Sequence, residues 1–199
     1  MNASDETIET YRNNFDKYVE RTPNEPIGEF KDWIDSFAVH VSPGGSILEI
    51  GSASGRDARY LKSKGFLVTC SDVIPEALSR LSAQGFETEE YDFRDAPNMT
   101  WINKFDGFFA NASLLHASQE VFEWTLGNVP RILKIGGIAA FSLKSGEGEE
   151  ITFEKMDAPR YFRYHSESEI REILTSLSFE ILSISHAEQG KWLHVIASS

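Results

Sequence analysis

Apolar and polar residues alternate along most of the chain in a way that is typical of strands and helices following one another. Five short segments, four of them mainly apolar, predict strands, and three of the stretches after them carry apolar residues at helical spacing. The predicted strands cover residues 46–50, 66–71, 86–91, 105–110 and 138–143, and the helices cover residues 54–64, 75–83 and 119–133. Because strand–helix units of this length pair in parallel with right-handed crossovers, the pattern predicts an α/β fold.

The two ends of the chain follow other patterns. Residues 4–20 and 29–41 carry aromatic and aliphatic side chains at helical spacing, which predicts two helices before the first strand. Near the C-terminus, a capped helix over residues 166–177 precedes two strands at 179–185 and 192–197. A turn joins these last two strands, so one of them should run antiparallel to the rest of the sheet.

Composition narrows the class of protein. The 199 residues have the size of one domain, and they include a single cysteine, Cys70, so no internal disulfide can form. The N-terminus is polar and no apolar run reaches the ~20 residues that cross a bilayer, so we expect a cytoplasmic protein without a membrane partner. The net charge of -12 repels phosphate backbones, although a local basic patch could still bind RNA.

The loop after the first predicted strand carries the first candidate chemistry. Gly51 and Gly55 lie between that strand and the next helix, where glycine lets the backbone approach a ligand. Asp72 ends the second strand, and an acid at that edge of a parallel sheet can accept hydrogen bonds from both hydroxyls of a ribose. Taken separately these residues could form a tight turn and a helix cap, whereas together they favour a nucleoside site. The glycine spacing differs from the G-x-G-x-x-G of nicotinamide enzymes.

Three segments resemble a known family. The sequence ILEIGSASG at residues 47–55 resembles motif I of the class I S-adenosylmethionine-dependent methyltransferases. The sequence FDGFFANASLLH at residues 105–116 is similar to the fourth-strand motif of that family, and LKIGG at residues 133–137 is similar to its L-K-P-G-G turn. The resemblance runs from about residue 8 to the C-terminus.

Within this family, residues 55–58, 113–116 and 144–149 resemble a group of small bacterial members, with tellurite-resistance-type and tRNA wobble-uridine methyltransferases as more distant relatives. The chain departs from the family pattern at two positions. Ala53 replaces the middle glycine of motif I; alanine costs little there if φ is negative, and on that basis we expect cofactor binding to survive. Ile135 replaces the proline of the turn, which should affect only the turn.

The resemblance implies a fold and a cofactor. The fold is a Rossmann-like, seven-stranded sheet, mostly parallel with an antiparallel strand in the C-terminal hairpin. We expect a single domain of residues 1–199, with an N-terminal helical lid (1–41) and a core (46–199). The cofactor is S-adenosylmethionine, with S-adenosylhomocysteine as its product, and no metal, since the five histidines show no metal-ligand spacing. The residues implied in cofactor binding are Glu49, Gly51, Ser52, Ala53, Gly55, Arg56, Asp72, Val73, Ile74, Asp92, Phe93, Asn111 and Ala112.

The resemblance also implies a place for each part of the cofactor. Glu49 should support the amino group of its methionine, and Arg56 could reach the carboxylate or simply cap the site. Asp72 should hold the ribose, Asp92 should meet the adenine amino group, and Asn111 should lie under the sulfonium. The apolar members of the set could equally be ordinary core residues.

Candidates for the acceptor side lie on four parts of the chain. His116 comes first, because it follows the fourth strand on the loop that should face the transferred methyl group; a packing or capping role is the alternative. Tyr11 and Tyr18 could close the lid through their hydroxyls or pack in the core, and Lys144 follows the fifth strand. Residues 160–165, RYFRYH, could bind an anionic acceptor or form an amphipathic edge.

These observations leave three functions open. The favoured one is a methyltransferase acting on a small molecule by in-line displacement, in which the protein mainly supplies alignment and excludes water. The second is a tRNA or other RNA methyltransferase, supported by the distant relatives and by residues 160–165 but without a strong basic stripe. The third is a cofactor-binding protein without turnover, for which Ala53 is a hint. We expect a monomer or a homodimer.

Overall fold

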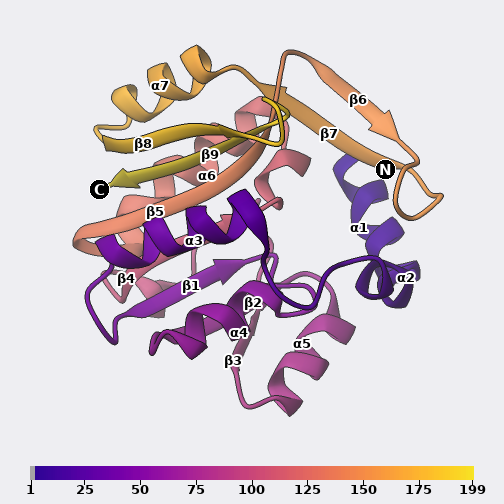
Figure 1. Cartoon of the computed structure of the whole chain (residues 1–199), viewed down its shortest axis with the longest axis horizontal. Helices are drawn as coiled ribbons and strands as arrows, with labels where there is room; N and C mark the ends of the chain where they lie inside the picture. The colour runs from indigo at the N-terminus through magenta and orange to yellow at the C-terminus, as the bar shows by residue number, and fades with distance from the viewer. Residues whose placement is uncertain (1–2) are drawn as a thin grey trace.

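The computed structural model describes residues 3–199, and Figure 1 shows a twisted sheet with helices on both sides. The helices of the described residues are α1 (Ala3–Asn13), α2 (Phe15–Glu20), α3 (Gly28–His40), α4 (Arg56–Ser63), α5 (Pro75–Ala83), α6 (Gln119–Ile132) and α7 (Glu167–Ser176), with short 3-10 turns at Met99–Trp101 and Leu114–His116. The strands are β1 (Ser46–Ile50), β2 (Leu67–Asp72), β3 (Glu87–Glu90), β4 (Phe105–Asn111), β5 (Leu133–Ser145), β6 (Glu149–Thr152), β7 (Arg160–His165), β8 (Glu180–Ala187) and β9 (Trp192–Ser198).

The strands of the sheet run in the predicted directions. Its main strands run in the order β3-β2-β1-β4-β5-β9-β8. The pairs from β3 to β5 are parallel, whereas β9 is antiparallel to both of its neighbours. This arrangement confirms the mostly parallel, Rossmann-like sheet with an antiparallel strand in the C-terminal hairpin. Its consequence is that the carboxyl ends of β1, β2, β3 and β4 meet at one edge.

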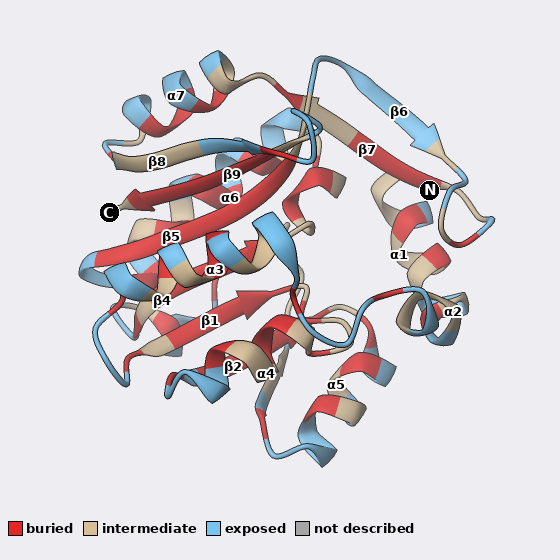
Figure 2. Cartoon of the chain, viewed as in Figure 1, coloured by how far each residue is buried: buried red, intermediate tan, exposed pale blue. Residues whose placement is uncertain are grey.

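Helices cover both faces of the sheet and bury its central strands, such as β1, β5 and β9, which are mostly red in Figure 2. On one face, the ring of Phe37 in α3 lies 5.3 Å from the ring of Phe109 in β4. On the other face, Phe122 of α6 lies 5.9 Å from Phe141 of β5. Each fully buried aromatic ring stabilises the fold by roughly 2–3 kcal/mol, so both layers fix the strand ends firmly.

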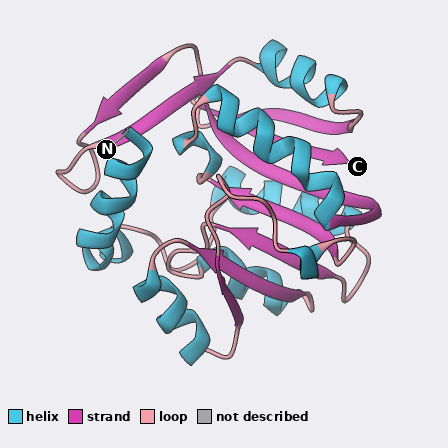
Figure 3. Cartoon of the chain, turned by 180° about the vertical axis from the view of Figure 1, so that it is seen from behind, coloured by secondary structure: helices cyan, strands magenta, loops and turns pink. Residues whose placement is uncertain are grey.

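An additional hairpin, β6–β7, was not predicted. Residues 160–165, interpreted from the sequence as a possible basic cluster or amphipathic edge, form β7, which pairs antiparallel with β6. The end of β5 pairs in parallel with β7, so the described chain has nine strands rather than seven. Figure 3 shows this hairpin reaching past the sheet toward the N-terminal helices.

The N-terminal segment also differs from its prediction, because the helix expected over residues 4–20 is divided into α1 and α2. Asn14 separates them, with φ at -126°, and its side-chain Nδ2 donates to the carbonyl of Thr10 at 2.9 Å. Asparagine side chains compete in this way with helical hydrogen bonds. Residues 1 and 2 of the expected lid (1–41) lie outside the described residues.

Helices α1 and α2 lie over the strand ends, whereas α3 packs on a face of the sheet (Figure 1). Two side chains join α1 to β7 and the residue before it. Thr7 Oγ1 accepts the backbone N–H of Tyr161 at 2.8 Å, and Thr10 Oγ1 donates to the carbonyl of Pro159 at 2.6 Å. In residues 3–199, no helix is long and apolar enough to span a membrane.

Candidate functional site

The bend after β1 brings the backbone close to the loop after β4. Gly51 and Gly55 have positive φ values of 72° and 75°. A Cβ added to Gly51 would lie 2.7 Å from the Cβ of Ser113, and one added to Gly55 would lie 2.4 Å from the Cδ2 of Leu81. Both positions therefore require glycine, for conformation and for space.

Ala53 lies in the same bend with φ at 46°, in the left-handed region. From the sequence a negative φ was assumed for Ala53, and this assumption is wrong. The turn keeps the conformation that suits glycine, at a cost of roughly 1–2 kcal/mol for an L-residue. The Ala53 N–H donates to Oδ2 of Asp72 at 2.8 Å, and this hydrogen bond helps to hold the strained residue in place.

Asp72 ends β2 with its carboxylate fixed by the backbone. Oδ1 accepts the N–H of Ile74 at 3.0 Å, while Oδ2 accepts the N–H of Ala53. The residue is 6% exposed and lines a cavity, and its oxygens have lone pairs beyond those that accept from Ala53 and Ile74. Burial raises the pKa of this carboxyl group.

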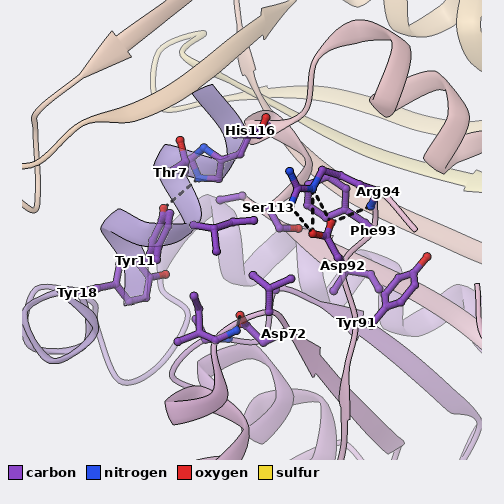
Figure 4. Close-up of a pocket in the computed structure, with 18 of the residues that line it drawn as sticks. Thr7, Tyr11, Tyr18, Asp72, Tyr91, Asp92, Phe93, Arg94, Ser113 and His116 are labelled. Carbon is purple, nitrogen blue, oxygen red and sulfur yellow. Dashed lines mark hydrogen bonds and ion pairs between the residues drawn. The ribbon is translucent and has the colours of Figure 1, made fainter. Parts of the chain in front are cut away.

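The cavity lies between the bend, the carboxyl ends of β2 and β4, and the helices α1 and α2 (Figure 4). The predicted cofactor residues that line it are Gly51, Ala53, Asp72, Val73, Ile74, Asp92, Phe93, Asn111 and Ala112. Three of the predicted acceptor-side residues, Tyr11, Tyr18 and His116, line it as well. Residues not singled out from the sequence include Thr7, Ile8, Tyr91, Arg94 and Ser113. The spacing of the motifs does not identify these residues, because they come from separate parts of the chain and meet at the cavity only in the folded protein.

The other predicted cofactor residues do not line this cavity; these are Glu49, Ser52, Gly55 and Arg56. Glu49 is 3% exposed, and burial together with the charge of Asp57 raises its pKa to about 8. Arg56 donates from Nε and Nη2 to the carboxylate of Asp57 at 2.7 and 2.9 Å. These residues brace the bend, and their contact with a cofactor stays a prediction.

The end of β4 is fixed by its own hydrogen bonds. Asn111 Nδ2 donates to Oδ2 of Asp57 at 2.8 Å, and its Oδ1 accepts from Ser142 Oγ at 2.6 Å. The same hydroxyl oxygen accepts the N–H of Ala112 at 2.8 Å. Asn111 and Ala112 therefore form a rigid part of the cavity wall beside the bend.

The loop after β3 joins the cavity to α1. Arg94 donates from Nε and Nη2 to Oδ2 of Asp92 at 2.9 and 2.6 Å, and from Nη1 to Asp5 of α1 at 2.6 Å. Figure 4 shows Arg94 and Asp92 together on one side of the cavity. Arg94 thus fixes the carboxylate that should face adenine and attaches α1 at the same time.

His116 and Tyr11 meet across the opposite side. Since the carbonyl oxygen of Tyr161 can only accept, the His116 Nδ1 that lies 2.6 Å from it must carry the proton. Nε2 then accepts from the hydroxyl of Tyr11 at 3.0 Å, and the oxygen of Tyr11 accepts from Arg160 Nη1 at 3.3 Å. Desolvation, reinforced by the charge of Arg160, lowers the pKa of His116 to about 4, so its imidazole is neutral.

A second cavity of about 300 Å³ adjoins the first. Tyr11, Tyr18, Ala112 and His116 line both cavities, and Lys144 lines the second one alone. The remaining wall comes largely from the β6–β7 hairpin and the loop between its strands. Among residues 3–199, no group of three or more His, Cys, Asp or Glu side chains could hold a metal ion.

The sequence matches one family model, described as a methyltransferase domain, over residues 48–141. These residues run from β1 into β5 and include the bend, Asp72 and the loop after β4. No protein of curated function matches the chain.

Solved structures with the same fold are numerous. A 1,6-didemethyltoxoflavin N1-methyltransferase from Burkholderia thailandensis, with 1,6-didemethyltoxoflavin and S-adenosylhomocysteine bound, has a TM-score of 0.75 at 18% identity over 98% of this chain and 86% of that chain. The DhpI–SAM–HEP complex has a TM-score of 0.72 at 20% identity over 96% and 97%. A putative zinc-dependent alcohol dehydrogenase from Rhodobacter sphaeroides has a TM-score of 0.76 at 12% identity over 100% and 98%. At such identities the likeness shows the fold alone.

Proposed function

We propose that the protein, whose residues 48–141 match a methyltransferase domain model, transfers the methyl group of S-adenosylmethionine to a small molecule in the second cavity. The observation that carries the proposal is that the two cavities meet at Tyr11, Tyr18, Ala112 and His116. A donor in the first cavity and an acceptor in the second would face each other there. Methyl transfer needs this alignment, because the reacting atoms must lie in line.

In this proposal the first cavity binds the adenosyl group. Gly51 and the buried Asp72 both line this cavity. In this proposal Asp72 binds the ribose hydroxyls and Asp92 the adenine amino group, with Val73, Ile74 and Phe93 against the base. Asn111 and Ala112 lie beside the sulfonium, and Glu49 supports the methionine amino group from behind the bend.

The cofactor supplies a methyl group that is already activated by a positive sulfur, so the protein mainly positions and encloses the reactants. The acceptor contributes the electron pair of the new bond to the methyl carbon, and the electrons of the broken carbon–sulfur bond stay on sulfur. The helices α1 and α2 exclude water from this junction. His116, which is neutral and has a low pKa, is a weak base and therefore suits an acceptor that reacts without losing a proton to the protein.

A small molecule is favoured over RNA as the acceptor by the position of the arginines in residues 160–165. Arg160 is 7% exposed, and Arg163 donates to Glu169 at 2.9 Å, so neither is free on a basic surface. A cavity of about 300 Å³ also lies at the lower end of the range for small-molecule sites. The sequence similarity to tRNA methyltransferases stays a distant one.

Three further proposals concern the protein as a whole. A single buried Cys70 suits a reducing compartment such as the cytoplasm, and we expect a monomer or homodimer. The contacts of α1 with β7 support a single domain for residues 1–199. Light scattering of the pure protein would measure the oligomeric state.

Calorimetry with S-adenosylhomocysteine tests the proposed function. The wild type should bind, and Asp72→Asn should weaken binding roughly 10- to 100-fold, because a charge-assisted hydrogen bond to the ribose is lost. Asp106→Asn is the matched control, since Asp106 lies in β4 near the opposite edge of the sheet and pairs with Lys134. If wild-type protein binds neither S-adenosylmethionine nor its product, the proposal fails. Release of S-adenosylhomocysteine with any acceptor would exclude the function without turnover.

A further inference from the structure

The second cavity combines inward cations with aromatic rings, and this chemistry points to a class of acceptor. We propose that the methyl acceptor is a small aromatic acid, bound as its anion with the acidic group against Arg160 and Lys155. This inference rests on the proposed function, because it identifies what the second cavity holds during methyl transfer.

The main observation is the buried position of the Arg160 side chain and its contacts. It is 7% exposed, and its guanidinium lies 4.8 Å from the ring centre of Phe162. Nη2 donates to the carbonyl of Glu154 at 2.8 Å and Nη1 donates to the Tyr11 hydroxyl, whereas Nε has no hydrogen-bond partner among residues 3–199.

No carboxylate within residues 3–199 forms an ion pair with this guanidinium, although the chain has 31 acidic and 19 basic residues. A buried charge without a counter-ion is costly, and an anionic ligand would remove that cost.

Two lysines bring further positive charge to the same wall. Lys155 Nζ lies 4.1 Å from the ring centre of Tyr18, and Lys144 Nζ lies 4.1 Å from that of Trp192. Burial, together with the charge of Arg160, lowers the pKa of Lys155 to about 8, and burial also lowers that of Lys144. Burial thus disfavours the protonated form of each lysine, and a bound anion would favour the protonated form again.

The acidic residues of the cavity form no ion pair with Arg160, Lys144 or Lys155 within residues 3–199. Glu150 and Glu154 contribute to the lining, but both are exposed. The carboxylate of Glu150 accepts a hydrogen bond from the hydroxyl of Tyr164, and only the backbone carbonyl of Glu154 contacts Arg160. The cations therefore face the interior, while the acids lie toward the solvent.

The rest of the wall suits a flat ring. Arg160, Phe162 and Tyr164 alternate along β7 on the cavity side, as the period of a strand requires. Tyr18 and Trp192 add aromatic surfaces from α2 and β9. Aromatic side chains of this kind prefer stacked or edge-on contacts with another ring, which separates an aromatic acid from a simple inorganic anion.

The test compares acids with their neutral counterparts. Protein saturated with S-adenosylhomocysteine would be titrated in a calorimeter with hydroxybenzoates, aminobenzoates and indole carboxylates, each paired with its primary amide. The acids should bind roughly 10- to 100-fold more tightly than the amides, as expected for charge-assisted hydrogen bonds. Arg160→Gln and Lys155→Gln, each saturated with S-adenosylhomocysteine, should lose this preference.

Arg163→Gln is the matched control, because it removes the same charge from the other face of β7 and should keep the preference for acids. Amides that bind as well as the acids, or acids that fail to bind at millimolar concentration, would overturn the inference and leave the proposed function standing. Loss of S-adenosylhomocysteine binding by the wild type would instead remove the proposed function and this inference with it.

A second measurement needs no acceptor. Because Arg160 is a buried charge without a counter-ion, Arg160→Met should raise the Tm of the ligand-free protein, as happens when a site is optimised for binding rather than for stability. A fall in Tm would identify Arg160 as a structural residue and overturn the inference.

Discussion

Ala53 shows how a single residue can keep a binding loop at some cost in stability. Its φ of 46° belongs to the left-handed region, yet its N–H donates to Asp72 and holds that carboxylate at the cavity. The sequence revealed Gly51, Asp72 and the end of β4 because their spacing follows a motif. It did not reveal Arg94, whose contact with Asp5 depends on a residue far away in the chain, and it left residues 160–165, which include Arg160, open between an anion site and an amphipathic edge.

Ala53→Gly should stabilise the protein by up to about 1 kcal/mol, because glycine adopts this φ without strain and the gain exceeds the added flexibility of the unfolded chain. Urea unfolding at constant pH would measure the change. Ala58→Gly, inside α4, is a control of opposite sign, with an expected loss of about 1 kcal/mol. A less stable Ala53→Gly variant would show that the backbone conformation of Ala53 is not strained.

The lid and the β6–β7 hairpin are the elements that the sequence described least well. The sheet strands were predictable because their apolar runs are buried on both faces. β6 was not predicted because three of its residues are exposed and it has no apolar run. The division between α1 and α2 was not predicted because it depends on the side chain of Asn14. Together α1, α2 and the hairpin enclose the second cavity, so its chemistry could not be predicted from motifs.

Tyr11→Phe should loosen α1, since it removes the hydrogen bonds of the Tyr11 hydroxyl with His116 and Arg160. A lost hydrogen bond of about 1 kcal/mol corresponds to a roughly fivefold increase in local opening. Amide hydrogen exchange of Ala3–Asn13 would measure it, with Tyr18→Phe in α2 as the control. Unchanged exchange in Tyr11→Phe would show that this hydrogen bond does not hold the lid.

At the scale of the whole molecule, the fold places most of its polar chemistry at one edge of the sheet and buries several ionisable groups elsewhere. Burial lowers the pKa values of His116, His165 and His194 to about 4. Burial raises the pKa of Glu49 to about 8, with the opposite consequence for stability. Stability therefore depends on pH through groups in different layers of the molecule.

The free energy of unfolding should fall as the pH falls from about 6.5 to about 4. In this range the histidines are protonated in the unfolded chain but stay neutral in the folded protein, where their pKa values are lower. Above about 6.5 their stabilising contribution is complete, and each histidine accounts for up to about 1.4 kcal/mol per pH unit below it. The contribution of Glu49 is complete below about 4.5 and is lost as the pH rises toward 8.

Urea unfolding at about pH 7 and about pH 5 would test the histidine effect. His194→Phe keeps the stacking on Trp33 and should lose less stability at the lower pH than the wild type does. His40→Gln, at an exposed position, should behave like the wild type. Equal losses in all three proteins would contradict the assignment.

A crystal structure with S-adenosylhomocysteine tests the central claim, that the bend after β1 and the end of β2 together bind an adenosyl group. The account predicts the ribose hydroxyls within hydrogen-bond distance of Asp72, the adenine beside Asp92 and the sulfur next to Ala112, facing the second cavity. A ligand bound elsewhere, or a sulfur turned away from Tyr11 and His116, would contradict it.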